Sequence, residues 1–480
     1  MTSSDSHAVT RQDEAASPPP LPEWAQRVLA PVYSAGRSFI VWSVVLLLIG
    51  AWSLYAYWLQ LTQGLEVTGL NRPVYWGFYI SNYVFFIGIS QAGILLSAIL
   101  RVWGADWRRP IMRAAEGLTL VAILFGVINI LFDLGRPERS YFMMLHGNIE
   151  SPLFWDSIAI SVFSLVSILY IYLAMIPDLA YIRDRYPHVR WLYALLAMGW
   201  KGTPRQKQNL DRILYWMALL ILPVAVTFDT VVSWVFSLTI QPMWHTAIFA
   251  PIFVIGAFFS GLAALLLVLA LLRKVYNLEG IIRPRHFDYI GRLLLVLTLI
   301  WGYFQFTENL TSYYGNEPIH IAILNAKLTG TYAVAFWGSV IGCFVIPVLV
   351  LSRKKTRNVN GSLVASIAIL IGMWLERYTI VIPTLVNPRL AYDRGVYDPT
   401  WVEWALLAGC TVFFVYAYML YTKIVPIVSL WELEEGIRSG VNEIKDDPTV
   451  ERPLGFGLGE DVKATASPGD EPAIARGQGD

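Results

Sequence analysis

Ten long apolar stretches are the feature of this sequence that most limits how it can fold. An α-helix needs about 20 such residues to cross roughly 30 Å of hydrocarbon. The stretches are predicted near residues 39–61, 74–100, 111–132, 153–176, 213–236, 248–272, 290–310, 331–351, 363–383 and 401–421. Only 15% of the 480 residues are charged, whereas about a quarter is usual in soluble proteins. The sequence therefore predicts an all-α integral membrane protein.

The placement of Lys and Arg predicts which way these spans run. An even number of spans puts both ends of the chain on one side of the membrane. If that side is the cytoplasm, 29 of the 36 basic residues lie in cytoplasmic segments, 6 in outer loops and one, Arg377, within a span. This asymmetry follows the positive-inside rule. We expect a bacterial inner-membrane protein with a cytoplasmic segment 1–38, a membrane domain 39–425 and a cytoplasmic tail 426–480 that is disordered at its end.

A weak internal similarity links the second and sixth spans. The second contains Gly88 and Gly93, and the sixth contains Gly256 and Gly261 at the same spacing. Each of the two spans is followed by a basic loop with an Arg-Pro pair. The pattern predicts two four-helix bundles, spans two to five and six to nine, plus two flanking helices. Small residues at helix contacts explain the same glycines without any duplication.

The histidines and cysteines argue against metal redox chemistry within this chain. All six histidines lie in predicted tails or loops, so no span offers the His pair that would hold a b-type haem. Cys343 and Cys410 are isolated within apolar runs, and they cannot build an iron–sulfur cluster or a zinc site. The net charge of +1 gives no indication of nucleic acid binding. Any electrons handled here are expected to arrive on an organic carrier and to leave through a partner subunit.

Three aspartates enter the outer third of the predicted bundle. Asp133 ends the third span, Asp156 begins the fourth, and Asp229 lies about two turns from the outer end of the fifth. Placing an ionisable side chain in lipid costs free energy, so the presence of each of the three aspartates requires an explanation. Their neighbours in the sequence include one cation and three aromatic residues, namely Arg136, Phe132, Trp155 and Trp234.

These side chains have the composition of a quinol site. Such a site needs an apolar slot, aromatic walls and hydrogen-bonding groups for the two hydroxyls. Quinol oxidation also releases two protons, which Asp156 and Asp229 are best placed to accept, with Asp133 as a third candidate. A structural role is the alternative, because an acid near a helix end is often a cap or half of an ion pair. Asp133 with Arg136 is the obvious local pair.

Five further ionisable residues lie in or beside the spans. Glu116 enters the third span from the cytoplasmic side, and Glu308 closes the seventh. Glu376 and Arg377 lie deep in the ninth span, and Glu403 begins the tenth. Intramembrane ionisable groups often mark proton relays, so one interpretation is a proton pathway through these residues. Salt bridges between helices are the alternative, and it is favoured for the residues of the second half of the chain.

Six short motifs resemble those of the NrfD/PsrC family of quinone-interacting membrane subunits. They occur in the family's order at residues 69–77 (GLNRPVYWG), 134–137 (LGRP), 151–156 (SPLFWD), 230–234 (TVVSW), 314–317 (YGNE) and 372–377 (GMWLER). The resemblance extends from about residue 69 to 421, which is most of the chain. Within the family, the chain is most similar to the ActC-type subunits of alternative complex III, and less similar to the paralogous ActF type.

The resemblance implies a menaquinol site near the periplasmic face, with Asp156 in the pocket and an iron–sulfur subunit docked beside it. It also implies multihaem cytochrome c subunits and a paralogous membrane subunit as partners, in a respiratory or photosynthetic complex that oxidises quinol and translocates protons. The chain would not be an enzyme alone. Four positions depart from the family pattern: Asp133, Asp229 and Gln91 stand where His is common, and Val235 where Asp is common.

Two other functions are left open by the sequence. The nearest alternative is the membrane anchor of a molybdenum-dependent reductase of the polysulfide reductase type, with the quinone reaction reversed. The chain would also serve as a scaffold paralogue that binds no quinone, in which case the buried acids are structural. A secondary transporter is disfavoured, because no pair of Gly- or Pro-broken helices occurs in matching halves of the sequence.

Overall fold

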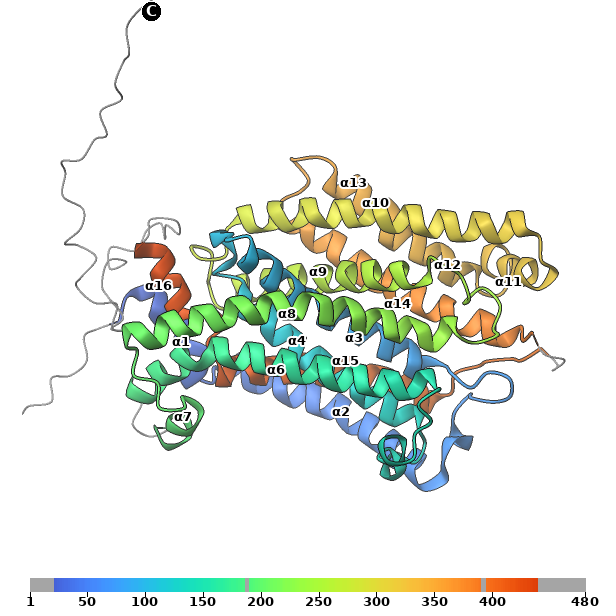
Figure 1. Cartoon of the computed structure of the whole chain (residues 1–480), viewed down its shortest axis with the longest axis horizontal. Helices are drawn as coiled ribbons and strands as arrows, with labels where there is room; N and C mark the ends of the chain where they lie inside the picture. The colour runs from blue at the N-terminus through green and yellow to red at the C-terminus, as the bar shows by residue number, and fades with distance from the viewer. Residues whose placement is uncertain (1–20, 186–189, 390–393, 439–480) are drawn as a thin grey trace, which may run out of the picture.

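The computed structural model describes residues 21–185, 190–389 and 394–438, and within them all regular structure is helical (Figure 1). Ten segments are long and apolar enough to cross a membrane. They are α2 (Arg37–Gln63), α3 (Phe78–Val102), α4 (Met112–Asp133), α6 (Pro152–Arg185), α8 (Pro204–Ser237), α9 (Phe249–Val275), α10 (Pro284–Gly315), α12 with α13 (Ala333–Val340 and Ile346–Leu351), α14 (Val359–Val386) and α15 (Trp401–Ile424). The predicted all-α membrane fold with about ten spans is confirmed.

Shorter elements lie at the two ends of the bundle. The helices α1 (Glu23–Tyr33), α7 (Arg190–Leu196) and α16 (Leu430–Arg438) lie at one end, which we call the terminal end (Figure 1). The opposite end carries α5 (Phe142–Leu145) and α11 (Pro318–Leu328). Single 3-10 turns occur at Leu65–Val67, Asp106–Arg108 and Pro137–Arg139, and a π-helical turn at Ile341–Val345 joins α12 to α13.

Helices α3 and α9 form the centre of the bundle and pack against each other. The first packs against α4 and α8, and α6 contacts both of these helices. The second packs against α10 and α14, and α14 in turn contacts α12 and α13, while α2 pairs with α15 at the side. This grouping agrees with two four-helix bundles and two flanking helices.

Two of the glycines singled out in the sequence lie at close helix contacts. A Cβ at Gly93 of α3 would overlap the carbonyl oxygen of Ala115 on α4. A Cβ at Gly256 of α9 would lie 2.6 Å from Nη2 of Arg377 on α14. Glycine permits such close approach because it has no side chain. Helix packing is therefore sufficient to explain both residues.

Part of each predicted tail folds against the bundle. Helix α1 and helix α16 bury apolar side chains in one shared core cluster, which includes Trp24, Ala25, Val28, Leu29, Leu430 and Leu433. Neither segment has a long apolar run, so both were predicted only as cytoplasmic extensions. Short amphipathic helices of this kind become stable when one face packs against other elements. The end of the tail that is predicted to be disordered lies beyond residue 438, outside the described residues.

Candidate functional site

Asp156 is buried in the first turns of α6, at the opposite end of the bundle. Only 7% of its surface is exposed. The hydroxyl of Tyr83 on α3 donates to both carboxylate oxygens of Asp156, at 3.1 and 3.0 Å. Tyr83 is itself buried, so the pair lies within the packed interior. Asp156 is a residue that the sequence singles out, whereas Tyr83 is one that sequence reasoning missed.

Asp229 on α8 is a second buried acid, with 3% of its surface exposed. Its Oδ1 accepts a hydrogen bond from Nε2 of Gln91 on α3, at 3.3 Å. The Oδ2 atom of Asp229 and the Oε1 atom of Gln91 are buried and have no hydrogen-bond partner among the described residues. Buried polar atoms are normally satisfied, and leaving one unpaired is costly. A hydroxyl group brought in by a ligand would satisfy either oxygen.

One face of α3 presents the groups that meet these acids. Tyr83 lies four residues after Tyr79 and eight before Gln91, so each of these side chains is within about 80° of it around the helix. Tyr83 reaches Asp156 and Gln91 reaches Asp229. Only the packing singles out Tyr83 in this aromatic-rich span, because it places the hydroxyl on Asp156.

Asp133, the third candidate acid, lies among side chains of α3 and α15. It ends α4 and is partly buried, and its Oδ1 has no hydrogen-bond partner among the described residues. Tyr79 and Glu403 are within electrostatic range of it. In the described part of the chain no ion pair joins Asp133 to Arg136, which is exposed in the following loop. The local pair considered from the sequence is therefore not formed.

The aromatic residues expected to wall the site are less enclosed than the acids. Trp155 and Trp234 are 48 and 46% exposed. The indole Nε1 of Trp155 donates to the carbonyl oxygen of Ile149 at 2.8 Å, in the loop that precedes α6. Phe132 packs on Tyr57 of α2, with ring centroids 4.7 Å apart. A role for Trp155 and Trp234 beside a quinol ring stays a prediction.

Glu376 and Arg377 pair with each other inside α14. Oε2 of Glu376 lies 3.1 Å from Nη1 of Arg377, and both residues are buried. Gln305 of α10 donates to the other carboxylate oxygen at 2.9 Å. The guanidinium of Arg377 lies 4.8 Å from the ring centroid of Phe253 on α9. The long arginine side chain thus folds back to its own neighbour, and among the described residues no ion pair joins Glu376 or Arg377 to another helix.

Glu308 and Glu403 are also buried but have different surroundings. Glu308 of α10 is within electrostatic range of Lys327 on α11 and of Glu376. Glu403 accepts three hydrogen bonds, from the Gly69 N–H at 2.7 Å, the Tyr397 hydroxyl at 2.6 Å and the Thr400 N–H at 3.0 Å. The last of these belongs to a capping box at the start of α15. Glu403 thus has the bonds of a structural cap, and its place in a proton pathway stays a prediction.

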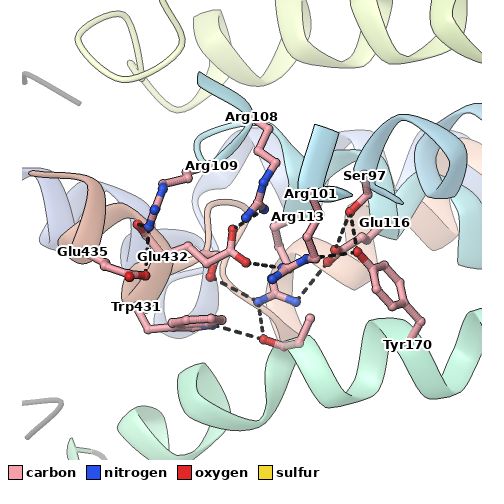
Figure 2. Close-up of polar contacts among 12 residues, drawn as sticks. Ser97, Arg101, Arg108, Arg109, Arg113, Glu116, Tyr170, Trp431, Glu432 and Glu435 are labelled. Atoms are coloured by element: carbon pink, nitrogen blue, oxygen red, sulfur yellow. Dashed lines mark hydrogen bonds and ion pairs between the residues drawn. The ribbon is translucent and has the colours of Figure 1, made fainter. Parts of the chain in front are cut away.

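Glu116 belongs to a buried ionic cluster at the terminal end (Figure 2). Arg113 forms ion pairs with Glu116 at 3.1 Å and with Asp178 at 2.7 Å, and all three side chains are buried. The Ser97 hydroxyl donates to Glu116 at 3.4 Å and is hydrogen-bonded to the Tyr170 hydroxyl at 3.1 Å. A buried arginine that satisfies two carboxylates from α4 and α6 holds these helices together at this end.

Helix α16 adds another carboxylate to this cluster, as Figure 2 shows. Glu432 is buried and forms ion pairs with Arg101 and, at 2.9 Å, with Arg108. Burial alone would raise the pKa of the Glu432 carboxyl, but Arg108, Arg101 and Arg113 together lower this pKa to about 2. Glu432 is therefore ionised at neutral pH and binds α16 to the arginines.

The ends of α16 are held by two further contacts. Oδ1 of Asp178 accepts hydrogen bonds from the backbone N–H groups of Leu430 and Trp431, at 3.0 and 3.3 Å. An acidic side chain satisfying the first N–H groups of a helix is a cap. At the rim, Arg109 pairs with Glu435 at 2.9 Å. The C-terminal helix is thus docked by charge and by capping as well as by apolar contact.

The described part of the chain contains no group of three or more His, Cys, Asp and Glu side chains arranged to hold a metal ion. Both cysteines are buried and free.

Comparison with known families decides to which group of proteins this helical bundle belongs. Residues 66–388 match the family model described as polysulphide reductase, NrfD. The chain belongs to the NrfD family. The matched stretch begins before α3 and ends just after α14. It contains most of the spans, and with them the Tyr83–Asp156 and Gln91–Asp229 pairs.

Three proteins of known name are similar to this chain over most of their length. A putative dimethyl sulfoxide reductase membrane subunit from Halobacterium salinarum is 27% identical over 80% of this chain and 89% of its own length. A selenate reductase subunit from Mesobacillus selenatarsenatis is 26% identical over 83% of this chain and 95% of its own length. An Hdr-like menaquinol oxidoreductase integral membrane subunit from Archaeoglobus fulgidus is 22% identical over 82% of this chain and 94% of its own length. By name, these three relatives are subunits of two reductases and of a menaquinol oxidoreductase.

Proposed function

We propose that this chain is the quinol-binding membrane subunit of an electron-transfer complex of the alternative complex III type, with menaquinol as its substrate. The site is formed by Asp156, Tyr83, Asp229 and Gln91. The observation that carries the proposal is the buried Tyr83–Asp156 pair together with Asp229, whose Oδ2 has no partner among the described residues. The relative named as a menaquinol oxidoreductase subunit supports this choice of substrate.

The terminal end faces the cytoplasm in this proposal. The basic stretches 101–113, 183–212, 273–285 and 353–357 all connect spans at that end, whereas six basic residues lie in the loops of the opposite end. Positive loops remain on the cytoplasmic side of a membrane. Asp156 and Asp229 then lie toward the periplasmic face of a bacterial inner membrane.

The loop between α4 and α6 supplies a surface for the electron acceptor. It exposes Leu145 and Ile149, which are 69 and 67% accessible, and it leads directly into the helix that carries Asp156. Exposed apolar side chains grouped in this way mark interaction surfaces. We assign this surface to an iron–sulfur subunit, from which electrons continue to multihaem cytochrome c subunits. A paralogous NrfD-like subunit would lie beside the chain in the membrane.

The chemistry assigned to the chain itself is proton acceptance. Quinol oxidation releases two electrons and two protons, and the electrons leave through the docked iron–sulfur subunit. The Asp156 carboxylate accepts one proton while the Tyr83 hydroxyl fixes its orientation, and Oδ2 of Asp229 accepts the other. Asp133 is the third candidate acceptor. Arg136, Trp155 and Trp234 are proposed to line the entrance.

Proton translocation is a further part of the proposal. Arg377 is within electrostatic range of Asp229 and pairs with Glu376, which in turn is within range of Glu308. These groups form a line across α8, α14 and α10, from the quinol site into the second helix bundle. Glu116 would be the cytoplasmic opening and Glu403 a periplasmic member of the same route.

A second candidate function is favoured by the names of two relatives. Both the dimethyl sulfoxide and the selenate reductase subunits are more similar in sequence to this chain than the menaquinol oxidoreductase subunit is. The chain would then be the membrane anchor of a reductase, with the same quinone site. Purification of the intact complex distinguishes the two, because a molybdopterin subunit identifies a reductase and multihaem cytochrome c identifies alternative complex III.

The test is an Asp156→Asn variant of the intact complex. Asparagine keeps the size and the hydrogen bond from Tyr83 but cannot take up the proton, so quinol-dependent reduction of the partner cofactors should be lost while assembly is normal. Glu150→Gln, at an exposed acid of the same loop, is the matched control and should keep the parental rate. An assembled Asp156→Asn complex that oxidises quinol at the parental rate would make Asp156 structural and favour the scaffold alternative.

A further inference from the structure

Helix α7 is almost entirely apolar, although it is not one of the ten candidate spans. Its sequence is RWLYALL, in which Arg190 at the start is the one charged residue. A helix without a polar face is expected in a protein interior or in a membrane, but not in water. Figure 1 shows α7 at the side of the bundle, beside α6 at the terminal end. Protein or lipid must therefore cover the apolar side chains of α7.

One face of α7 is fixed to the bundle by hydrogen bonds. Tyr193 is buried, and its hydroxyl donates to the carbonyl oxygen of Ile424 at the end of α15, at 2.9 Å. The Tyr172 hydroxyl of α6 donates to the carbonyl oxygen of Leu196 at 2.6 Å. These bonds hold α7 against two spans, so its other face has a defined direction.

That other face presents large apolar side chains to the outside. Trp191 and Leu195 are four residues apart, which places them on one side of the helix, and Met198 lies in the turn that follows. They are 75, 72 and 70% exposed. Because α7 lies between the end of α6 and the start of α8, this face is at the boundary of the membrane. Tryptophan is enriched at such boundaries.

Basic residues surround the exposed apolar face. Arg190 precedes it, and Lys201 and Arg205 follow it, and all three are exposed. Residues 183 to 212 include seven Lys and Arg but only two acidic residues. One of these two, Asp184, forms an ion pair with Arg183 at 2.7 Å. Apolar side chains with a basic rim are typical of helices that lie in the interface of a membrane containing anionic lipids.

We infer that α7 is an interfacial anchor: Trp191, Leu195 and Met198 enter the lipid leaflet at the terminal end, and Arg190, Lys201 and Arg205 bind anionic phospholipid headgroups. The occupant of this surface is the lipid itself and not another protein. Because α7 joins α6 to α8, lipid bound here supports the two helices that carry Asp156 and Asp229 at their other ends. The inference stands independently of the quinol site.

Collision accessibility of a spin label tests where the apolar face lies. Leu195→Cys is labelled in the intact complex in lipid nanodiscs, with the two native cysteines kept because they are buried. A label in lipid collides with oxygen but is shielded from a water-soluble nickel chelate. Leu48→Cys on the exposed face of α2 and Lys354→Cys in the loop after α13 are the lipid and water references.

The three outcomes of this measurement are distinct. We expect the label at 195 to have higher oxygen accessibility and much lower nickel accessibility than the label at 354, shifted toward the values at 48. Nickel accessibility equal to that at 354 would show that α7 faces water and would overturn the inference. Protection from both reagents would show that a protein covers α7, which also overturns it.

Lipid retention tests the basic rim separately. The paired substitution Arg190→Gln with Lys201→Gln should reduce the phosphatidylglycerol that copurifies with the complex in detergent, as measured by mass spectrometry. Lys354→Gln with Lys355→Gln removes two charges from an exposed loop at the same end and should leave retention unchanged. Equal retention in the Arg190 and Lys201 variant and in the parent would show that these residues do not bind headgroups.

Discussion

The hydroxyl of Tyr83 donates to both carboxylate oxygens of Asp156, at 3.1 and 3.0 Å, from α3 to the first turns of α6. A carboxylate held in this way has a fixed orientation, which is what a proton acceptor beside a bound substrate needs. The two residues are 73 positions apart in the chain. The site therefore depends on how the spans pack and not on any local motif.

Substitution of Tyr83 by Phe removes this orientation without leaving a cavity. A hydrogen bond to a charged group contributes about 1.5–3 kcal/mol, so we expect kcat/KM for quinol to fall roughly 10- to 100-fold. Tyr79→Phe is the matched control, because it removes a buried hydroxyl of the same helix that bonds to Gln60 instead. Equal effects of the two substitutions on quinol oxidation would contradict a specific role for Tyr83.

Asp229→Asn should also lower quinol oxidation, since the amide cannot accept the second proton. If Asp156 and Asp229 serve one two-proton reaction, the double variant should be little slower than the slower single variant, because residues that act together are not additive. The rates of the parent, both single variants and the double variant give the coupling. Fully multiplicative losses would show that the two acids act independently.

Glu376→Gln tests whether the line of charges across α14 carries protons. The substitution keeps the hydrogen bond with Gln305 but removes the titratable group. We expect fewer protons released per quinol oxidised, measured with a pH dye in proteoliposomes at matched turnover. The same proton yield as the parent would remove Glu376 from the pathway and leave its pair with Arg377 as a structural one.

Arg113→Leu should destabilise the terminal end of the bundle. It leaves Glu116 and Asp178 buried without their cation, and losing one partner of a buried ion pair costs roughly 3–5 kcal/mol. The complex should unfold at a markedly lower temperature. Adding Glu116→Gln and Asp178→Asn to the same chain should recover part of the loss, because the unpaired charges are gone. An unchanged unfolding temperature in the single variant would show that the ion pairs of Arg113 do not stabilise this end.

The docking of α16 on the helix bundle should depend on pH only below about pH 4.5, the ordinary pKa of a glutamate. Because the pKa of Glu432 is lowered from 4.5 to about 2 in the folded protein, its contribution is complete above pH 4.5 and is lost as the pH falls toward 2. Hydrogen exchange of the α16 amides should stay slow from neutral pH down to 4.5. Glu432→Gln should speed this exchange at neutral pH, whereas Glu435→Gln, at the partly exposed rim, should not.

The spans could be predicted because a membrane helix needs a long uninterrupted apolar run. The ends of the helices could not be predicted from the apolar runs. A helix can extend beyond the hydrocarbon into polar sequence and end at a capping residue there. The fifth span is predicted at 213–236, but α8 begins at Pro204, where Thr203 and Gln206 form a capping box. Helix α16 could not be predicted either. Its Glu432 carboxylate is neutralised by Arg101 and Arg108, which lie more than 300 positions earlier in the chain.

The candidate site was only partly predictable for a similar reason. Acids in apolar spans are conspicuous, so Asp156 and Asp229 could be found from the sequence. A tyrosine in an aromatic-rich apolar span is not conspicuous, and Tyr83 became a candidate only when the packing placed it on Asp156. Asp133 shows the opposite error, because its position at a helix end suggested a pair with Arg136 that the described residues do not form.

Photolabelling tests the central claim most directly, because it locates the quinone without relying on activity. A menaquinone analogue with a photoreactive ring substituent is cross-linked to the intact complex in its membrane, and the modified peptides are identified by mass spectrometry. We expect labels on α3 near Tyr83 and on α6 near Asp156, which excess menaquinone prevents. Labels confined to the second helix bundle, or to other subunits with this chain unlabelled, would contradict the proposed site.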